Sequence, residues 1–498
     1  MTAAAGPVPS RPASAGRMPS LALPGRLLRL ELRRSGIRWM LPLLAALFWF
    51  GTYRKSMALP PLWSQRITVM QQNALIDFAP FVAGAAAWMG SRDGRRSTTD
   101  LVAVTALPRW AARVATWAAT TCWAIVTYLG CVAVLYGVTA RQVTWGGPLW
   151  WPVAVGAAGV VAVSALGFVA SAHFPGRFTA PLAAVGALLA LLVSVLAAQR
   201  SSPYAQILPV NTDILGPDTG VFYPYQPDVS IAQVMFLAGL AAAALGALGL
   251  PAGSGGRWLR RASAAVTAAG LLAAGTGVGL AGTARLEAHG WVIPALHDAA
   301  SNQPVPYTPV CGHAAVPVCL HPAFRAYLPA LTAALGPVLS QLAGLRGAPV
   351  RVTQVATTYQ QTPGGPVPVA GNDPIISGSP PVLDLPFPDV SGAGVTTADA
   401  IDQVPLGVAT TIVDTVIGGG TPAQQAVAAA LLAADGVPLA SDCSRGQACQ
   451  GVPGPAPGSP AYVAAGRFAA LPAATRHAWL AAHLAALRAG RVTLTEIP

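Results

Sequence analysis

The sequence predicts an all-α polytopic membrane protein with about seven membrane-spanning helices, followed by a mainly α-helical C-terminal domain that contains little β structure. Apolar residues make up 53% of the 498 residues and charged residues only 10%, and the mean hydropathy is +0.53. The apolar residues gather in separate runs, most of which reach the roughly 20 residues that a bilayer requires. The arginines lie between these runs, which indicates a membrane topology.

The residues before the first apolar run divide into two segments. Residues 1–20 are rich in Ala, Pro, Ser and Gly and have no continuous apolar core, so we expect a disordered cytoplasmic tail and no secretory signal peptide. Residues 21–38 mix leucines with arginines. An amphipathic helix of this composition lies at the inner membrane surface, with its guanidinium groups among the lipid head groups.

Seven apolar segments follow, and we expect a transmembrane domain over residues 39–284 with spans at residues 39–53, 73–90, 115–139, 152–172, 179–198, 231–250 and 263–284. With the N-terminus placed in the cytoplasm, 16 Lys and Arg residues fall on the inside and 5 on the outside. Positive charge resists translocation, so this bias supports the placement. Residues 285–498 then form an extracytoplasmic domain of a multi-pass protein of the cell membrane.

The loop between the second and third spans, residues 91–113, is basic and contains a short amphipathic run that ends at Pro108. Such a helix lies flat at the interface or docks a partner. We expect the docking residues to be Arg92, Asp93, Arg95, Arg96, Thr99, Asp100, Leu101, Pro108 and Arg109.

This loop resembles the one that follows the second span of type-2 ABC exporter permeases. The shared pattern is a charged pair at Arg92-Asp93, a Gly/Arg-Thr step, a Leu-containing helix and a Pro-led turn at Leu107-Pro108-Arg109. The resemblance covers roughly residues 21–250, with Asp93 where the family usually has Glu and with seven spans instead of the usual six. It implies that the loop is a coupling helix that touches a separate ATPase subunit, and that residues 21–38 form a connecting helix that leans on the same ATPase.

The sequence argues against an enzyme. Its only lysine, Lys55, follows an Arg, so the chain lacks the Gly-x-x-x-x-Gly-Lys-Ser/Thr loop that cradles phosphates. It also lacks a His-Glu-x-x-His zinc-peptidase motif and a Gly-x-Ser-x-Gly nucleophile elbow. The net charge is +14 over residues 1–284 and −2 over residues 285–498, and its place between spans does not indicate nucleic-acid binding. No cofactor or metal is expected.

Asp77 is the one acidic residue within a predicted span. A carboxylate in a span is a candidate for substrate binding or proton transfer. Because Asp77 lies in the outer turns of its span, a water-exposed position at the interface is the alternative.

The C-terminal domain contains four of the six cysteines, Cys311, Cys319, Cys443 and Cys449. An even number of cysteines outside the cell favours disulfides, and the local pairs Cys311–Cys319 and Cys443–Cys449 are our choice among three pairings. The repeat Cys311-Gly-His313 and Cys319-Leu-His321 leaves a zinc site as the alternative. We expect helices at 322–345, 397–417, 422–435, 460–470 and 473–489, a strand at 350–356 and a loop over 361–395.

Two functions of different classes fit these features. The first is the permease subunit of an ABC transporter, an exporter energised by a separate ATPase that docks at the coupling loop. The second is a membrane-anchored extracytoplasmic sensor or binding protein without transport activity. Gly275 and Gly279 in the seventh segment form a GxxxG pair that permits close contact with another helix, as in a homodimer or a pair with a second permease. Scarce Lys beside abundant Arg and Ala is a composition typical of GC-rich genomes such as those of actinobacteria.

Overall fold

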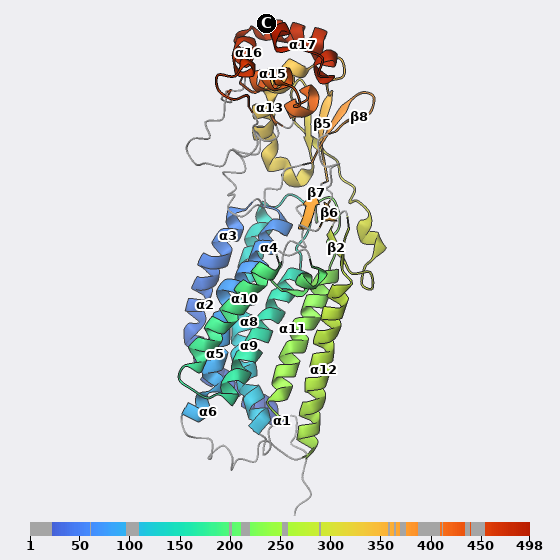
Figure 1. The fold of residues 1–498 in the computed structure, drawn as a ribbon. Helices are drawn as coiled ribbons and strands as arrows, with labels where there is room; N and C mark the ends of the chain where they lie inside the picture. The colour runs from blue at the N-terminus through green and yellow to red at the C-terminus, as the bar shows by residue number, and fades with distance from the viewer. Residues whose placement is uncertain are drawn as a thin grey trace, which may run out of the picture.

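The computed structural model describes residues 22–59, 61–95, 109–198, 202–210, 220–250, 257–287, 290–356, 359–362, 365–368, 375–386, 409–410, 412–433, 439 and 454–498. These residues form a long helical bundle with a smaller C-terminal domain stacked on one of its ends (Figure 1). The fold is mostly helical with little strand, which confirms this part of the predicted class.

Nearly all of the described residues of the bundle are helical. Their bounds are α1 (Ala22–Arg34), η1 (Gly36–Met40), α2 (Leu41–Leu47), η2 (Phe48–Tyr53), α3 (Arg54–Ala58), α4 (Trp63–Asn73), η3 (Ala74–Phe78), α5 (Ala79–Gly90), α6 (Arg92–Arg95), α8 (Arg109–Gln142), α9 (Trp151–His173), α10 (Thr179–Ala198), η4 (Pro203–Ile207), α11 (Asp228–Ala247) and α12 (Arg257–Gly282).

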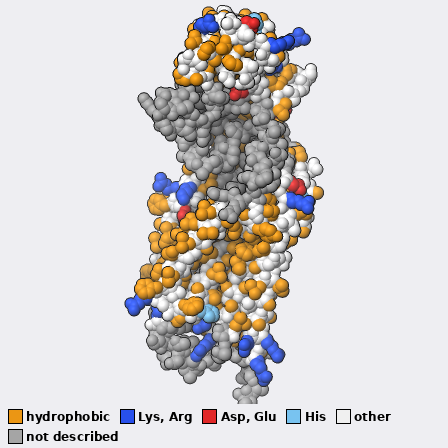
Figure 2. Space-filling view, viewed as in Figure 1, with side chains coloured by type: hydrophobic (Ala, Val, Ile, Leu, Met, Phe, Trp, Pro, Cys, Tyr) orange, Lys and Arg blue, Asp and Glu red, His pale blue; other side chains and the backbone are white. Residues whose placement is uncertain are grey.

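Five of these helices, within the described residues, are long and apolar enough to cross a membrane: α8, α9, α10, α11 and α12. Their outward faces are strongly apolar, and Figure 2 shows this apolar surface along the flank of the bundle. The first two predicted spans lie in helical segments that π-helical turns divide, η2 in residues 36–58 and η3 in residues 63–90. Each α-helical piece on either side of a π-helical turn is therefore shorter than the hydrocarbon core of a bilayer is thick.

Helix α4 extends the second predicted span by about ten residues at its start. Its sequence is too polar to be recognised by hydropathy, yet Ser64, Gln65, Arg66 and Gln71 are buried. The Arg66 guanidinium donates to Gln142 Oε1 at 2.6 Å, and Gln71 Nε2 donates to the Pro209 carbonyl at 2.8 Å. For Arg66 and Gln71, hydrogen bonds to neighbouring segments therefore replace water.

The C-terminal domain packs helices against a small mixed sheet. Its elements are β1 (Arg285–Glu287), β2 (Gly290–Val292), η5 (Ala299–Asn302), β3 (Val310–Cys311), β4 (Val318–Leu320), η6 (Pro322–Tyr327), α13 (Leu328–Leu342), β5 (Arg351–Val355), β6 (Tyr359–Thr362), β7 (Gly365–Pro368), β8 (Ile375–Ser377), β9 (Val382–Pro386), α15 (Pro422–Ala433), α16 (Pro460–Ala470), α17 (Ala473–Arg488) and η9 (Leu494–Glu496).

The sheet has the order β3-β4-β5-β9-β8, with parallel pairing in the middle and antiparallel pairing at both edges. The predicted strand at 350–356 is β5. The expectation of a loop over 361–395 is wrong in part, because β9 pairs along its whole length with β5. Leu383 and Leu385 of β9 point into the same core as Val352, whereas Asp384 between them does not, which is the alternation of a half-buried strand.

Two predicted segments cannot be compared with the structure. The tail of residues 1–20 and the second cysteine pair, Cys443 and Cys449, lie outside the described residues. The predicted helix at 397–417 is described only at residues 409–410 and 412–417, all of which are helical.

Candidate functional site

The end of the bundle farthest from the C-terminal domain carries α1, α6 and the first turns of α8 and α12 (Figure 1). We call it the basic end, because Arg33, Arg34, Arg109, Arg257 and Arg260 all belong to these segments. Figure 2 shows a concentration of Lys and Arg side chains there, beyond the apolar flank. Charged groups outside an apolar belt are typical of a membrane boundary.

Helix α1 lies against α8 at the basic end and is joined to α6 by an ion pair. Arg92 Nη1 and Nη2 donate to Glu31 Oε2 and Oε1 at 3.2 and 3.3 Å, a two-point contact between residues 61 positions apart. Trp123 Nε1 on α8 donates to the Leu32 carbonyl at 3.0 Å. The amphipathic helix and the start of the basic loop therefore form one surface.

Arg95 packs against Trp88 at the C-terminal end of the second predicted span. Its guanidinium carbon lies 3.5 Å from the centre of the Trp88 ring, and Nη2 donates to the Trp88 carbonyl at 2.8 Å. The backbone of Asp93 lies in α6, and Arg109 begins α8. The remaining predicted docking residues lie outside the described part of the chain: Arg96, Thr99, Asp100, Leu101 and Pro108.

Asp77 lies in the π-helical turn η3, opposite the π-helical turn η2 and midway along the helical segment of residues 63–90. Its carboxylate is 28% exposed and lies 3.4 Å from the ammonium nitrogen of Lys55, which is 56% exposed. π-Helical turns widen a helix locally and occur frequently at functional sites. Here η2 and η3 face each other, with the Asp77 carboxylate between them, which makes Asp77 a candidate functional residue.

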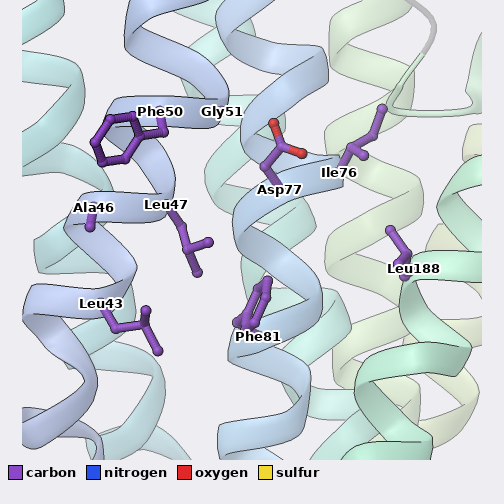
Figure 3. A pocket seen from close by; sticks show the side chains of 9 residues that line it. All are labelled: Leu43, Ala46, Leu47, Phe50, Gly51, Ile76, Asp77, Phe81 and Leu188. Atoms are coloured by element: carbon purple, nitrogen blue, oxygen red, sulfur yellow. The ribbon is translucent and has the colours of Figure 1, made fainter.

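Asp77 lines a lateral groove of about 400 Å³ whose other lining residues are Leu43, Ala46, Leu47, Phe50, Gly51, Ile76, Phe81 and Leu188. Figure 3 shows the Asp77 carboxylate at one end of the groove, with Leu43, Leu47 and Phe81 extending away from it. Among these lining residues Asp77 is the only charged one. The site is therefore an apolar groove with one carboxylate at its end.

Gly51 is required for this geometry. A Cβ atom added at position 51 would overlap the Asp77 carboxylate. Glycine therefore lets the two π-helical turns approach until the carboxylate fits between them.

A third cluster joins the bundle to the C-terminal domain, and we call it the junction. The fully buried His321 ring lies 4.7 Å from the Trp145 ring, 4.8 Å from Phe222 and 4.2 Å from Tyr307, between ring centres. Thr144 Oγ1 donates to the Pro322 carbonyl at 2.9 Å. Burial lowers the pKa of His321 to about 4. Side chains of both parts thus surround one neutral imidazole.

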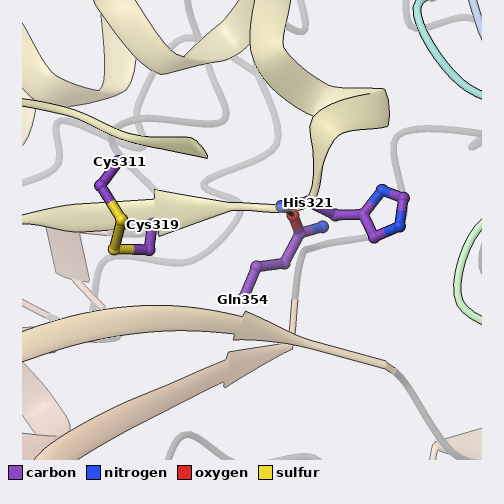
Figure 4. Close-up of a disulfide and its surroundings, with 4 residues drawn as sticks. All are labelled: Cys311, Cys319, His321 and Gln354. Carbon is purple, nitrogen blue, oxygen red and sulfur yellow. Dashed lines mark hydrogen bonds between the residues drawn. A yellow bond between two sulfur atoms is a disulfide. The ribbon is translucent and has the colours of Figure 1, made fainter. Parts of the chain in front are cut away.

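The disulfide between Cys311 and Cys319 is present, as predicted. It links directly opposed residues of β3 and β4. Figure 4 shows the His321 ring directed away from this disulfide, while its backbone N–H donates to Gln354 Oε1 at 2.8 Å. Both cysteines of the zinc alternative are consumed by the disulfide, and the described residues contain no group of three or more His, Cys, Asp or Glu side chains that could hold a metal ion.

Comparison of the chain with known protein families, curated proteins and solved structures gives no match. The family resemblance of the basic loop therefore rests on the residues of this chain alone.

The sequence pointed to Asp77 and the basic loop, but it gave no indication that Lys55, Gly51 or the aromatic residues of the junction lie at these clusters. Lys55 lies 22 positions before Asp77, and nothing in its neighbourhood indicates a partner in the next span. Gly51 is one glycine among 52. The aromatic residues of the junction come from segments between helices, where hydropathy does not indicate burial. Near His321, the repeated Cys-x-His pattern was the only feature of the sequence that drew attention to this region.

Proposed function

We propose that the chain is the membrane-spanning permease subunit of an ABC transporter, an exporter energised by a separate ATPase subunit. Alternating access of the bundle would move a substrate across the cell membrane. The observation that carries the proposal is the Glu31–Arg92 ion pair. It joins α1 to α6, which belong to the two segments that the resemblance assigns to ATPase contact, so one partner could bind both.

The proposed topology has seven spans, the five long helices and the two segments divided by π-helical turns. The N-terminus and the basic end then face the cytoplasm, and the C-terminal domain lies outside the cell. This orientation agrees with the excess of arginines at the basic end and with a disulfide in the C-terminal domain, since disulfides persist in oxidising compartments.

The test is affinity purification of the full chain from its native membrane in mild detergent. We expect an ATPase subunit to copurify with the unaltered chain. Arg95→Glu places a negative charge at the proposed docking surface and removes the stacking on Trp88, so recovery of the ATPase should fall about tenfold, the scale of 1.4 kcal/mol.

Arg141→Glu is the matched control, because Arg141 is an exposed arginine at the opposite end of α8. It should leave recovery of the ATPase unchanged. Absence of any ATPase, even after chemical crosslinking, would refute the permease proposal and leave the membrane-anchored extracytoplasmic binding protein as the better account.

A further inference from the structure

The lateral groove combines a small charged end with a long apolar body. Its volume of about 400 Å³ lies within the range of small-molecule binding sites. The groove is lined by segments of the first, second and fifth predicted spans. A ligand that fits it must be mostly apolar, with one polar group at the Asp77 end.

The groove opens sideways. Leu43, Phe50 and Phe81 line it and are 49%, 64% and 41% exposed, which places a large apolar rim on the flank of the bundle. In the proposed topology this flank faces lipid. An amphiphile could therefore enter from the bilayer without crossing the aqueous phase.

The negative charge of Asp77 determines which head group of an amphiphile the groove can bind. Asp77 supplies a negative charge and hydrogen-bond acceptors, and it already holds an ammonium group, that of Lys55, at 3.4 Å. Lys55 reaches the carboxylate from α3, directly after η2, but does not line the groove. An external amine would take the same position from the groove side, whereas a carboxylic acid would be repelled.

We propose that the groove binds a single-chain amphiphile whose head group is a protonated primary amine, with the ammonium on Asp77 and the alkyl chain between Leu47 and Phe81. Lys55 is then a competing internal cation that leaves Asp77 when the amphiphile binds. That such an amphiphile is also the transported substrate rests on the proposed permease function; its binding does not.

The test is photolabelling of the purified full chain in mild detergent with a long-chain alkylamine that carries a diazirine in its chain. A fatty acid with the same chain and diazirine position is the matched probe. We expect the amine to label peptides that contain residues 43–51 or 76–81, and unlabelled alkylamine to compete. The fatty acid should label these peptides about tenfold less, the scale of one charge-assisted hydrogen bond.

Three variants and two controls separate the contribution of the Asp77 charge from that of the apolar part of the groove. Asp77→Asn should reduce amine labelling to the level of the fatty acid, and Lys55→Gln should increase amine labelling because the competing cation is gone. Leu47→Trp narrows the channel and should reduce labelling by both probes. Leu182→Trp, at a 67% exposed position on another face of α10 than Leu188, and Glu287→Gln, an exposed carboxylate on β1, are controls that should change nothing.

Equal labelling by the amine and the fatty acid, or full amine labelling of Asp77→Asn, would overturn the proposal and leave a groove for any lipid chain. A decrease in Lys55→Gln would overturn the competition by Lys55. Because no ATPase is present in this experiment, its failure would not bear on the permease proposal, which copurification tests separately.

Discussion

At the scale of single residues, His321 is the side chain on which the junction is centred. Its ring is completely buried among Trp145, Phe222 and Tyr307, and its Nδ1 accepts the Ala323 N–H at 3.1 Å. Burial of the ring in this aromatic surrounding disfavours the charged imidazolium and lowers its pKa to about 4. The junction therefore requires neutral histidine.

This requirement predicts a pH-dependent stability. An unfolded histidine takes up a proton below about pH 6.5, whereas His321 in the folded protein does so only below about pH 4. The unfolded state thus binds more protons between these values. The contribution of His321 to stability should be complete above pH 6.5 and fall as the pH falls, by about 2 kcal/mol at pH 5.

The measurement is the thermal unfolding midpoint in detergent at about pH 7 and about pH 5. His321→Gln should be less stable than the unaltered chain at pH 7 because the ring packing is lost, but should lose less on acidification. His313→Gln changes an exposed histidine of the same segment and should behave like the unaltered chain. An equal loss on acidification in His321→Gln would show that another group causes it.

Asp77 shows what sequence can and cannot reveal about a residue. A carboxylate within an apolar run was identified because its charge is incompatible with lipid unless it has a partner or a function. The partner itself, Lys55, was not predictable, since the contact depends on two π-helical turns that face each other across two helices. Helical periodicity does not indicate where a helix widens.

At the scale of elements, α11 and α12 are packed through glycines. A Cβ at Gly270 would overlap the backbone of Ala243 on α11, and one at Gly239 would meet the backbone of Ala274 and Gly270. A Cβ added at Gly275 or Gly279, the predicted GxxxG pair, would meet no atom of the described residues within 4 Å. The close contact exists on α12, but on a different face from the one that the motif indicated.

Two substitutions on α12 test this packing. Gly270→Val forces the helices apart and should destabilise the bundle by about 1–3 kcal/mol. Gly275→Val adds the same atoms on the open face and should change stability by less than about 0.5 kcal/mol. The midpoint of thermal unfolding in detergent distinguishes the two variants. Equal destabilisation would contradict the packing described here, and a change of oligomeric state in Gly275→Val alone would identify its face as an interface between copies.

The elements were predictable where hydropathy alone decides them. The five long helices coincide with predicted spans to within a few residues at most ends, because burial in lipid requires continuous apolar sequence. Helix α4 and strand β9 were missed for opposite reasons. Arg66 and Gln71 of α4 are polar, and they are buried because residues distant in the sequence accept their hydrogen bonds. Strand β9 is short and has several Pro residues near it, so its sequence does not indicate a strand before it pairs with β5.

At the scale of the whole molecule, the chain has two different ends. The basic end gathers α1 and the start of the loop at residues 91–113, and the other end is covered by a disulfide-containing domain that shares a core with Leu62, Val221 and Phe222 of the bundle (Figure 1). A movement within the bundle would reach the C-terminal domain through this shared core. We propose that an ATPase subunit binds at the basic end.

Site-specific photocrosslinking in the native membrane tests this claim most directly. A photoreactive amino acid at position 30 replaces Leu30, which is 50% exposed on α1, and another at position 463 replaces Val463, which is 55% exposed on α16 of the C-terminal domain. We expect a crosslinked ATPase from position 30 and none from position 463. A crosslinked ATPase from position 463, or its absence from position 30 and from neighbouring positions of α1, would contradict the account.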